Sequence, residues 1–338
     1  MFIFGRYSRE KPTADFGFTA WHCREAMDRS AILRADDGML LLGRLDGRLQ
    51  NSPCADIFLA RARLTGAAAL AGLAGVPIGV ADLQAWIAGR APPPRASEGL
   101  NDPVSVAAIF HLALSRDDDE EDPVAQATLN VLRSILDDRS EAEIYGKDDV
   151  AHFGPLWRRV RSAADAPFSA GDLLEVAGRI FDLVALTEQT TGSGADVVAV
   201  DGRSWSLPAR DRDRNWLIAT AVPRLLHRAG FTSRIIPSLT LLPKFLPPSR
   251  SALAELLATT LGEAAYAALR DLDGIERAVS LQSIGRPVTR RSKAPALARL
   301  LVAYPGLQPA AVAKLLNVTP QGARKLLSAR SPSRPMLV

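Results

Sequence analysis

The clearest pattern of apolar and polar positions lies near the end of the chain, over residues 308–328. Two groups of apolar residues recur there at helical spacing, on either side of Asn317. These apolar positions are Val312, Ala313, Leu316, Val318, Ala323, Leu326 and Leu327. Asn317 tolerates the left-handed backbone conformation of a tight turn, and the small alanines allow close helix crossing. The pattern predicts two short helices around a turn, as in a DNA-binding helix-turn-helix.

Helix-start signals agree with this pattern. Pro309 and Pro320 stand at first-turn positions, where the missing N–H of proline costs nothing, and Thr319 can cap the second helix. The exposed positions of the second helix, at about 319–329, carry side chains that can donate to phosphates and base edges. They are Thr319, Gln321, Arg324, Lys325 and Ser328. In the major groove, Gln321 and Arg324 are expected to contact base edges.

The distribution of charge favours DNA binding over an ordinary helical hairpin. Residues 277–338 hold eleven of the 41 Lys and Arg and no Asp or Glu. The preceding 276 residues therefore hold 30 basic and all 37 acidic side chains, a net charge of −7. A solvated surface mixes both signs, whereas a module that binds a polyanion does not. Phosphate contacts are expected from Lys314, Arg290, Arg291, Lys293 and Arg330, and duplex DNA is the predicted partner.

Helical spacing also dominates the rest of the chain, so the protein is predicted to be mainly α. Residues 1–50 form the least regular part, in which 38–45 is either a short strand or the start of a helix. A helical bundle is expected over 51–190, and a small β-hairpin followed by helices over 191–285, because Asp201-Gly202 between apolar runs is a strong turn signal. The chain ends in a three-helix DNA-binding domain at 286–338, completed by a helix at 295–304.

Composition gives no sign of a metal, a cofactor or a membrane span. Cys23 and Cys54 form no disulfide framework, and the four histidines stand far apart without a partner at ligand spacing. The acidic run 117–122 is better explained as a loop before a helix N-terminus than as a divalent-metal site. No run approaches the roughly 18 apolar residues of a membrane helix, and no signal peptide is seen. We therefore expect a soluble cytoplasmic protein without a cofactor.

Three stretches carry a resemblance to a known family: Leu45-Asp-Gly-Arg-Leu49 with Ser52-Pro53, Ser204-Trp-Ser-Leu-Pro-Ala-Arg-Asp-Arg-Asp-Arg214, and the C-terminal motif. The chain resembles alphaproteobacterial, often plasmid-borne proteins that combine a DUF1612-type domain with a C-terminal helix-turn-helix. The order of its elements is more distantly similar to that of Fic-type nucleotidyltransferases. Those enzymes need a His base and a Gly-rich phosphate loop. Residues 205–215 contain neither, so the part at 191–285 is expected to be a degenerate, non-catalytic Fic-like unit.

The sequence leaves three functions open. The first is a sequence-specific DNA-binding regulator of transcription or of plasmid and mobile-element maintenance. The second is an enzyme that acts on nucleotides or nucleic acid, and the third is a helical interaction scaffold. Arg210, Arg212 and Arg214 could hold an anion, although surface pairing with neighbouring acids is favoured.

A homodimer on an inverted-repeat site is also predicted, because a single helix-turn-helix contacts only a few base pairs. The apolar stripes at 55–75 and 249–283 are either its contact face or internal core.

Overall fold

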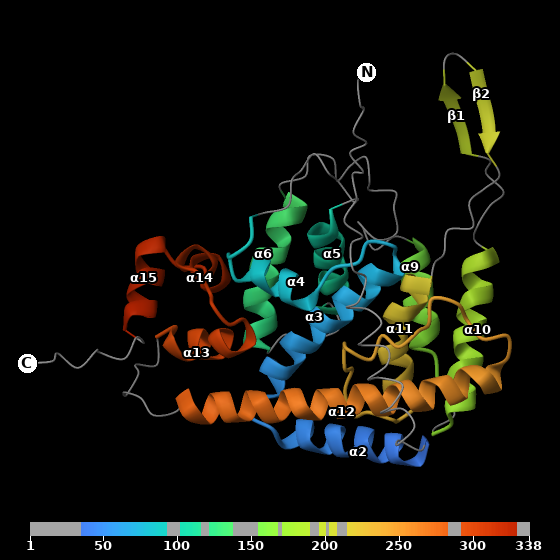
Figure 1. The fold of residues 1–338 in the computed structure, drawn as a ribbon, viewed down its shortest axis with the longest axis horizontal. Helices are drawn as coiled ribbons and strands as arrows, with labels where there is room; N and C mark the ends of the chain where they lie inside the picture. The colour runs from blue at the N-terminus through green and yellow to red at the C-terminus, as the bar shows by residue number, and fades with distance from the viewer. Residues whose placement is uncertain are drawn as a thin grey trace, which may run out of the picture.

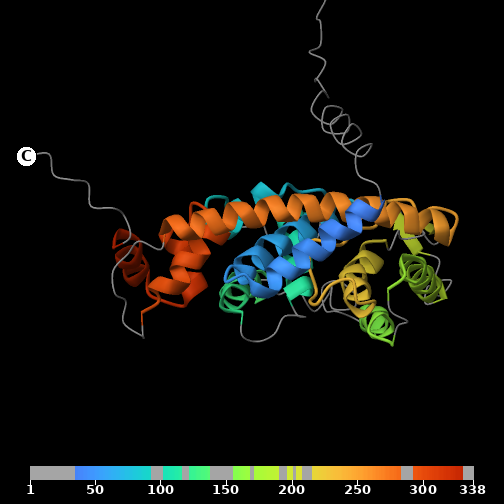
Figure 2. The same cartoon turned by 90° about the horizontal axis from the view of Figure 1, so that it is seen from below.

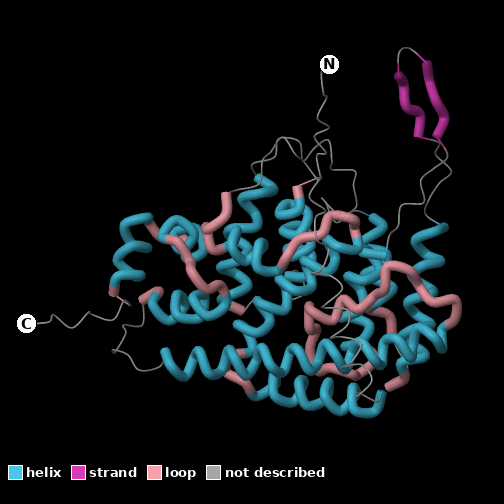
Figure 3. Tube along the Cα trace, viewed as in Figure 1, coloured by secondary structure: helices cyan, strands magenta, loops and turns pink. Residues whose placement is uncertain are grey.

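The computed structural model describes residues 35–92, 102–115, 122–137, 155–167, 171–189, 196–200, 203–207, 215–282 and 292–329. These residues are mainly helical, which confirms the predicted fold class (Figures 1 and 3). The helices are α2 (Ala35–Asn51), α3 (Ala55–Leu73), α4 (Val80–Ile87), α5 (Pro103–Ser115), α6 (Pro123–Asp137), α9 (Pro155–Ala164), α10 (Leu173–Gln189), α11 (Asn215–Arg228), α12 (Arg250–Gln282), α13 (Ala294–Ala303), α14 (Pro309–Leu316) and α15 (Pro320–Ser328).

Two largely apolar helices form the centre of the molecule. Every residue of α5 from Ser105 to Ser115 is buried, and α3 buries most of its length between α4, α5, α6, α11, α12 and α13. A helix that is hydrophobic all round is expected to be buried in this way. Gly66 of α3 has no room for a side chain, because a β-carbon there would lie 2.2 Å from the carbonyl oxygen of Pro237. The apolar stripe of α3 is therefore internal core and not a dimer face.

The N-terminal segment is more regular than the sequence indicates. Residues 1–50 were expected to be the least regular part, with 38–45 either a short strand or the start of a helix, and the helix is the correct alternative: α2 covers Ala35–Asn51 and buries Leu42, Leu45 and Leu49 completely. Three glycines lie within α2, and glycine disfavours helix, so local propensity conceals this element. The helix is stabilised by tertiary packing of its leucine stripe instead.

A long helix supports α2 along its whole length. The 33 residues of α12 span about 50 Å and run from α10 to α13, side by side with α2 (Figures 1 and 2). Gly38 of α2 touches Gly262, and ten residues later Arg48 bonds to Asp273 and Glu276 at 2.6 Å each. Because the contacting residue numbers increase together in α2 and in α12, the two helices run in the same direction. A β-carbon on Gly262 would lie only 2.8 Å from the Cα atom of Gly38, so glycine permits this crossing.

Helices α3, α4, α5, α6, α9 and α10 lie in the stretch 51–190, for which helices are expected. The cap of α10 is Asp172, whose Oδ1 accepts a hydrogen bond from the N–H of Leu174 at 2.8 Å. Two short strands, β1 (Asp196–Val200) and β2 (Arg203–Leu207), pair antiparallel in the stretch for which a hairpin is predicted.

The last three helices lie at one end of the molecule, where α13 and α14 pack against α3 and α6 (Figure 1). Their apolar residues join the same hydrophobic cluster as those of the body, with Leu297, Tyr304 and Val312 fully buried. The core is therefore continuous across the predicted domain boundary near residue 286. In the part of the chain that the structure describes, no helix is long and apolar enough to cross a membrane.

Candidate nucleic-acid interface

The turn between α14 and α15 has the geometry that the sequence predicts. Asn317 adopts the left-handed conformation, with φ of 50°, and the N–H of Val318 donates to the carbonyl of Ala313 at 3.0 Å. Thr319 is extended, and its hydroxyl accepts a hydrogen bond from the N–H of Gly322 at 3.1 Å. These contacts end one helix and begin the next within three residues. The predicted helix bounds, turn and cap are confirmed.

The two faces of α15 have opposite character. Ala323 is fully buried, and Leu326 and Leu327 pack against the hydrophobic cluster. The residues on the other face are exposed: Gln321, Arg324, Lys325 and Ser328. Their spacing of three, one and three places them on one stripe of the helix. Thr319 extends this polar stripe at the N-terminal end of α15, where it is also exposed.

The described cations around α15 are available to an anionic partner. Lys314, Arg324, Lys325 and Lys293 are exposed. Within the described residues none of these four forms an ion pair with a carboxylate. The remaining predicted contact residues, Arg290, Arg291, Arg330, Arg210, Arg212 and Arg214, lie outside the described residues.

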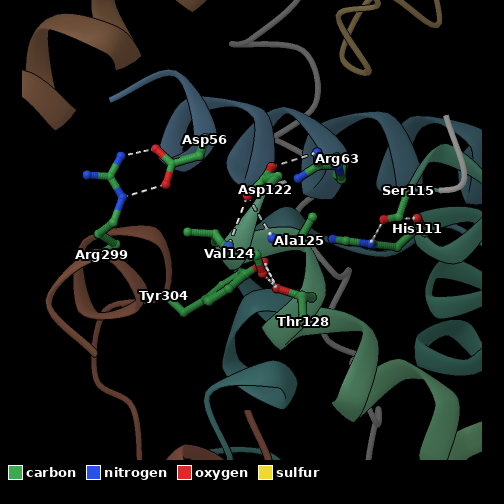
Figure 4. Close-up of polar contacts among 10 residues, drawn as sticks. All are labelled: Asp56, Arg63, His111, Ser115, Asp122, Val124, Ala125, Thr128, Arg299 and Tyr304. Carbon is green, nitrogen blue, oxygen red and sulfur yellow. Dashed lines mark hydrogen bonds and ion pairs between the residues drawn. The ribbon is translucent and has the colours of Figure 1, made fainter. Parts of the chain in front are cut away.

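Arg299, on α13, shows that the charge count alone overstates this surface. Its guanidinium forms a two-pronged ion pair with the carboxylate of Asp56 on α3, and Nη2 also donates to the carbonyl of Pro53 at 2.6 Å (Figure 4). The hydrogen bond to Asp56 raises the pKa of Arg299, against the opposing effect of burial. This arginine therefore ties α13 to the body and does not add to an outer basic surface.

Polar contacts with the body also fix α14 in place. The side-chain amide of Asn130 on α6 donates to the carbonyl of Leu315 at 3.1 Å, and the N–H of Gln308 donates to the carbonyl of Ala88 at 2.9 Å. The hydroxyls of Tyr304 and Thr128 lie 2.8 Å apart in a fully buried contact (Figure 4). Burial raises the pKa of Tyr304 to about 12, so the phenol stays protonated at neutral pH. These contacts cannot be predicted from the amino-acid sequence, because each joins residues far apart in the chain.

A second polar cluster is buried between α3, α5 and α6 (Figure 4). Arg63 is completely buried, and its Nη2 lies 3.1 Å from Oδ2 of Asp122. The other oxygen of Asp122 accepts hydrogen bonds from the N–H groups of Val124 and Ala125 and so caps α6. This carboxylate agrees with the expectation of negative charge before a helix N-terminus. It stabilises α6 and neutralises a buried arginine at the same time.

His111 and Ser115 in α5 do not form a catalytic pair. The Ser115 hydroxyl donates to the carbonyl of His111 at 2.8 Å and lies 3.1 Å from Nδ1 of the ring, where the direction of donation depends on the tautomer. Both residues are buried within α5, so the contact belongs to the core. Burial and the nearby charge of Arg63 lower the pKa of His111 to about 3, so the ring is neutral. Among the described residues no group of His, Cys, Asp or Glu is placed to hold a metal ion.

Comparisons of the chain with protein-family models, with curated proteins and with solved structures found no match. The resemblance to DUF1612-type and Fic-type proteins therefore stays a prediction from the sequence.

Proposed function

We propose that the protein binds duplex DNA sequence-specifically, with α13, α14 and α15 as a helix-turn-helix unit. In this proposal α15 enters the major groove, and Gln321 and Arg324 contact base edges. Lys325, Lys314 and Lys293, with Arg290, Arg291 and Arg330, contact phosphates. A role in regulating transcription or in maintaining a plasmid or mobile element follows from this activity as part of the proposal.

The observation that carries the proposal is the outer stripe of α15. It is polar, exposed and cationic, it follows a capped helix start, and its cations have no carboxylate partner among the residues that the structure describes. A helix that only completed a hydrophobic core would be expected to mix acids with bases on its solvent side. A groove-binding helix instead needs donors on that side, because phosphates and the major-groove edge of guanine are acceptors.

The predicted homodimer is part of the same proposal. One helix-turn-helix contacts only a few base pairs, and two-fold pairing on an inverted repeat doubles the discriminating contacts. The contact face does not include the α3 stripe, since those residues are buried within one chain. Sedimentation at micromolar concentration, with and without DNA, should give the mass of two chains. A mass of one chain in both samples would contradict the dimer and leave DNA binding intact.

Salt titration of DNA binding by the full chain tests the proposal. Each phosphate contact adds about 0.9 to the slope of log affinity against log salt, so binding through several cations should weaken by orders of magnitude between about 50 and 200 mM salt. Lys314→Ala should reduce that slope by about 0.9 on every duplex. Arg250→Gln is the matched control, because Arg250 is 61% exposed but lies at the far end of α12, beside Asp182. Binding that ignores salt, or equal effects of the two variants, would contradict the proposal.

A further inference from the structure

A turn of the body lies against the start of the proposed helix-turn-helix. After α4 the chain reverses at Gly89, which has a φ of +73°, and the N–H of Arg90 donates to the carbonyl of Ala85 at 2.8 Å. This is the hydrogen-bond pattern of a helix C-terminus closed by a left-handed glycine. A β-carbon on Gly89 would lie 3.1 Å from Cβ of Ala311 and 3.4 Å from Cβ of Gln308. The turn is thus in van der Waals contact with the first turn of α14.

The position of Arg90 is fixed by this contact. The N–H of Gln308 bonds to the carbonyl of Ala88, which holds the two segments together. Arg90 crosses Gly306: a β-carbon on Gly306 would lie 3.2 Å from both Cδ and Nε of Arg90. Arg90 is nevertheless exposed. Within the described part of the chain it forms no ion pair or hydrogen bond through its guanidinium.

The length of α14 relates Arg90 to the groove. Its eight residues span about 12 Å, which equals the width of the major groove of B-DNA, about 12 Å. The start of α15 follows directly on the C-terminal end of α14, while Arg90 lies beside its N-terminal end. When the second helix of such a unit occupies the groove, the first helix crosses the DNA backbone. A cation beside the N-terminal end of α14 then lies about one groove width from the start of α15 in the groove. A phosphate strand borders the groove at that distance.

We propose that the C-terminal turn of α4, through Arg90, is a further contact surface for the phosphate backbone of duplex DNA. This inference rests on the proposed function and extends the interface from the three C-terminal helices to the body. It assigns the body a direct part in DNA binding. Arg90 contributes affinity and fixes the orientation of the protein, but it carries no sequence preference, because phosphates are the same at every base pair.

The experiment compares wild type, Arg90→Gln, Arg90→Lys and the control Arg250→Gln in the full chain, by fluorescence anisotropy with a labelled duplex over a range of salt. Arg90→Gln is expected to lower affinity about 3- to 10-fold near 0.1 M salt and to reduce the salt slope by about 0.9. Arg90→Lys keeps the charge and should retain the wild-type slope. Ethylation interference should show one phosphate whose modification weakens wild type and leaves Arg90→Gln unaffected.

The outcomes separate the two proposals. If wild type binds DNA with the expected salt dependence and Arg90→Gln behaves like Arg250→Gln, the Arg90 contact is refuted and the proposed function stands. If Arg90→Lys loses as much as Arg90→Gln, the effect comes from packing over Gly306, and the phosphate contact is likewise refuted. If wild type itself shows no salt-dependent binding to any duplex, the proposed function fails, and the Arg90 contact fails with it.

Discussion

Arg299 and Arg324 belong to the same acid-free stretch of the chain, but their surroundings differ completely. Arg299 is half-buried and is neutralised by Asp56 on α3, whereas Arg324 lies on the exposed stripe of α15 without a carboxylate partner among the described residues. Net charge along a sequence is therefore not the charge of a surface. Cations that the fold pairs internally stabilise the protein, and only those left unpaired outside can bind a polyanion.

The largest expected effect concerns the charges that are paired inside the protein, at the buried pair of Arg63 and Asp122. Asp122→Ala removes one carboxylate partner of a completely buried guanidinium and should lower the free energy of unfolding by about 3–5 kcal/mol, as measured by urea denaturation. Asp172→Ala is the matched control, because Asp172 also caps a helix in an exposed contact and forms no ion pair with a buried arginine among the described residues. Asp172→Ala should lower the free energy of unfolding by about 1 kcal/mol. Equal losses would show that Arg63 is not neutralised by Asp122.

A second inward effect is a pH dependence caused by His111. Burial lowers the pKa of His111 to about 3, whereas the unfolded chain takes up the proton near 6.5. The unfolded state therefore binds more protons below pH 6.5, and this contribution to stability is lost as the pH falls toward 3. Between pH 7 and pH 5 the loss should be about 2 kcal/mol. His111→Gln should remove that part of the pH dependence, and an unchanged profile would contradict the assignment.

The crossing of α2 and α12 gives a third test of the inner side. Gly262→Ala places a methyl group 2.8 Å from the Cα atom of Gly38, so overpacking should cost about 1–3 kcal/mol. Gly274→Ala lies in the same helix with no atom within 4 Å, and its higher helix propensity should stabilise the protein by up to about 1 kcal/mol. Thermal or urea unfolding of both variants measures these two changes in stability. If both variants have the same stability, the close approach of α2 and α12 is wrong.

Substitution of an exposed cation on α15 should change the affinity for DNA and leave the free energy of unfolding unchanged. Arg324→Ala should weaken binding to a specific site by about 1–3 kcal/mol, weaken binding to random DNA less, and leave unfolding unchanged. Arg299→Ala should do the reverse, because it breaks the contact with Asp56 and removes no phosphate or base contact. Anisotropy titrations and urea denaturation of both variants give the two readouts. If the two variants change DNA affinity and the free energy of unfolding by the same amounts, the distinction between Arg299 and Arg324 is wrong.

Local signals explain which parts of the fold could be predicted. Pro309, Asn317, Thr319 and Pro320 each favour one backbone conformation at one place, and α14, its turn and the start of α15 follow from them. No such signal exists for α2, where glycines argue against a helix and the stabilising contacts come from α12, more than 200 residues away.

The candidate site divides in the same way. The exposed stripe of α15 follows from helical periodicity, so Gln321, Arg324, Lys325 and Ser328 could be predicted. The sequence does not predict which cations are neutralised, since the pair of Arg299 and Asp56 joins residues 243 positions apart. Arg90 also lacks any sequence signal. Only the contact of Gly89 with α14 places it beside the proposed helix-turn-helix.

The central claim is that the exposed stripe of α15 recognises DNA sequence, and selection of duplexes from a random pool tests it most directly. The full-length protein should enrich a defined motif, and Arg324→Ala should lose the preference at one position of each half-site while keeping the rest of the motif. Arg299→Ala, assayed where it remains folded, should enrich the wild-type motif. Enrichment of no motif by the wild-type protein, or of an identical motif by Arg324→Ala, would contradict the account.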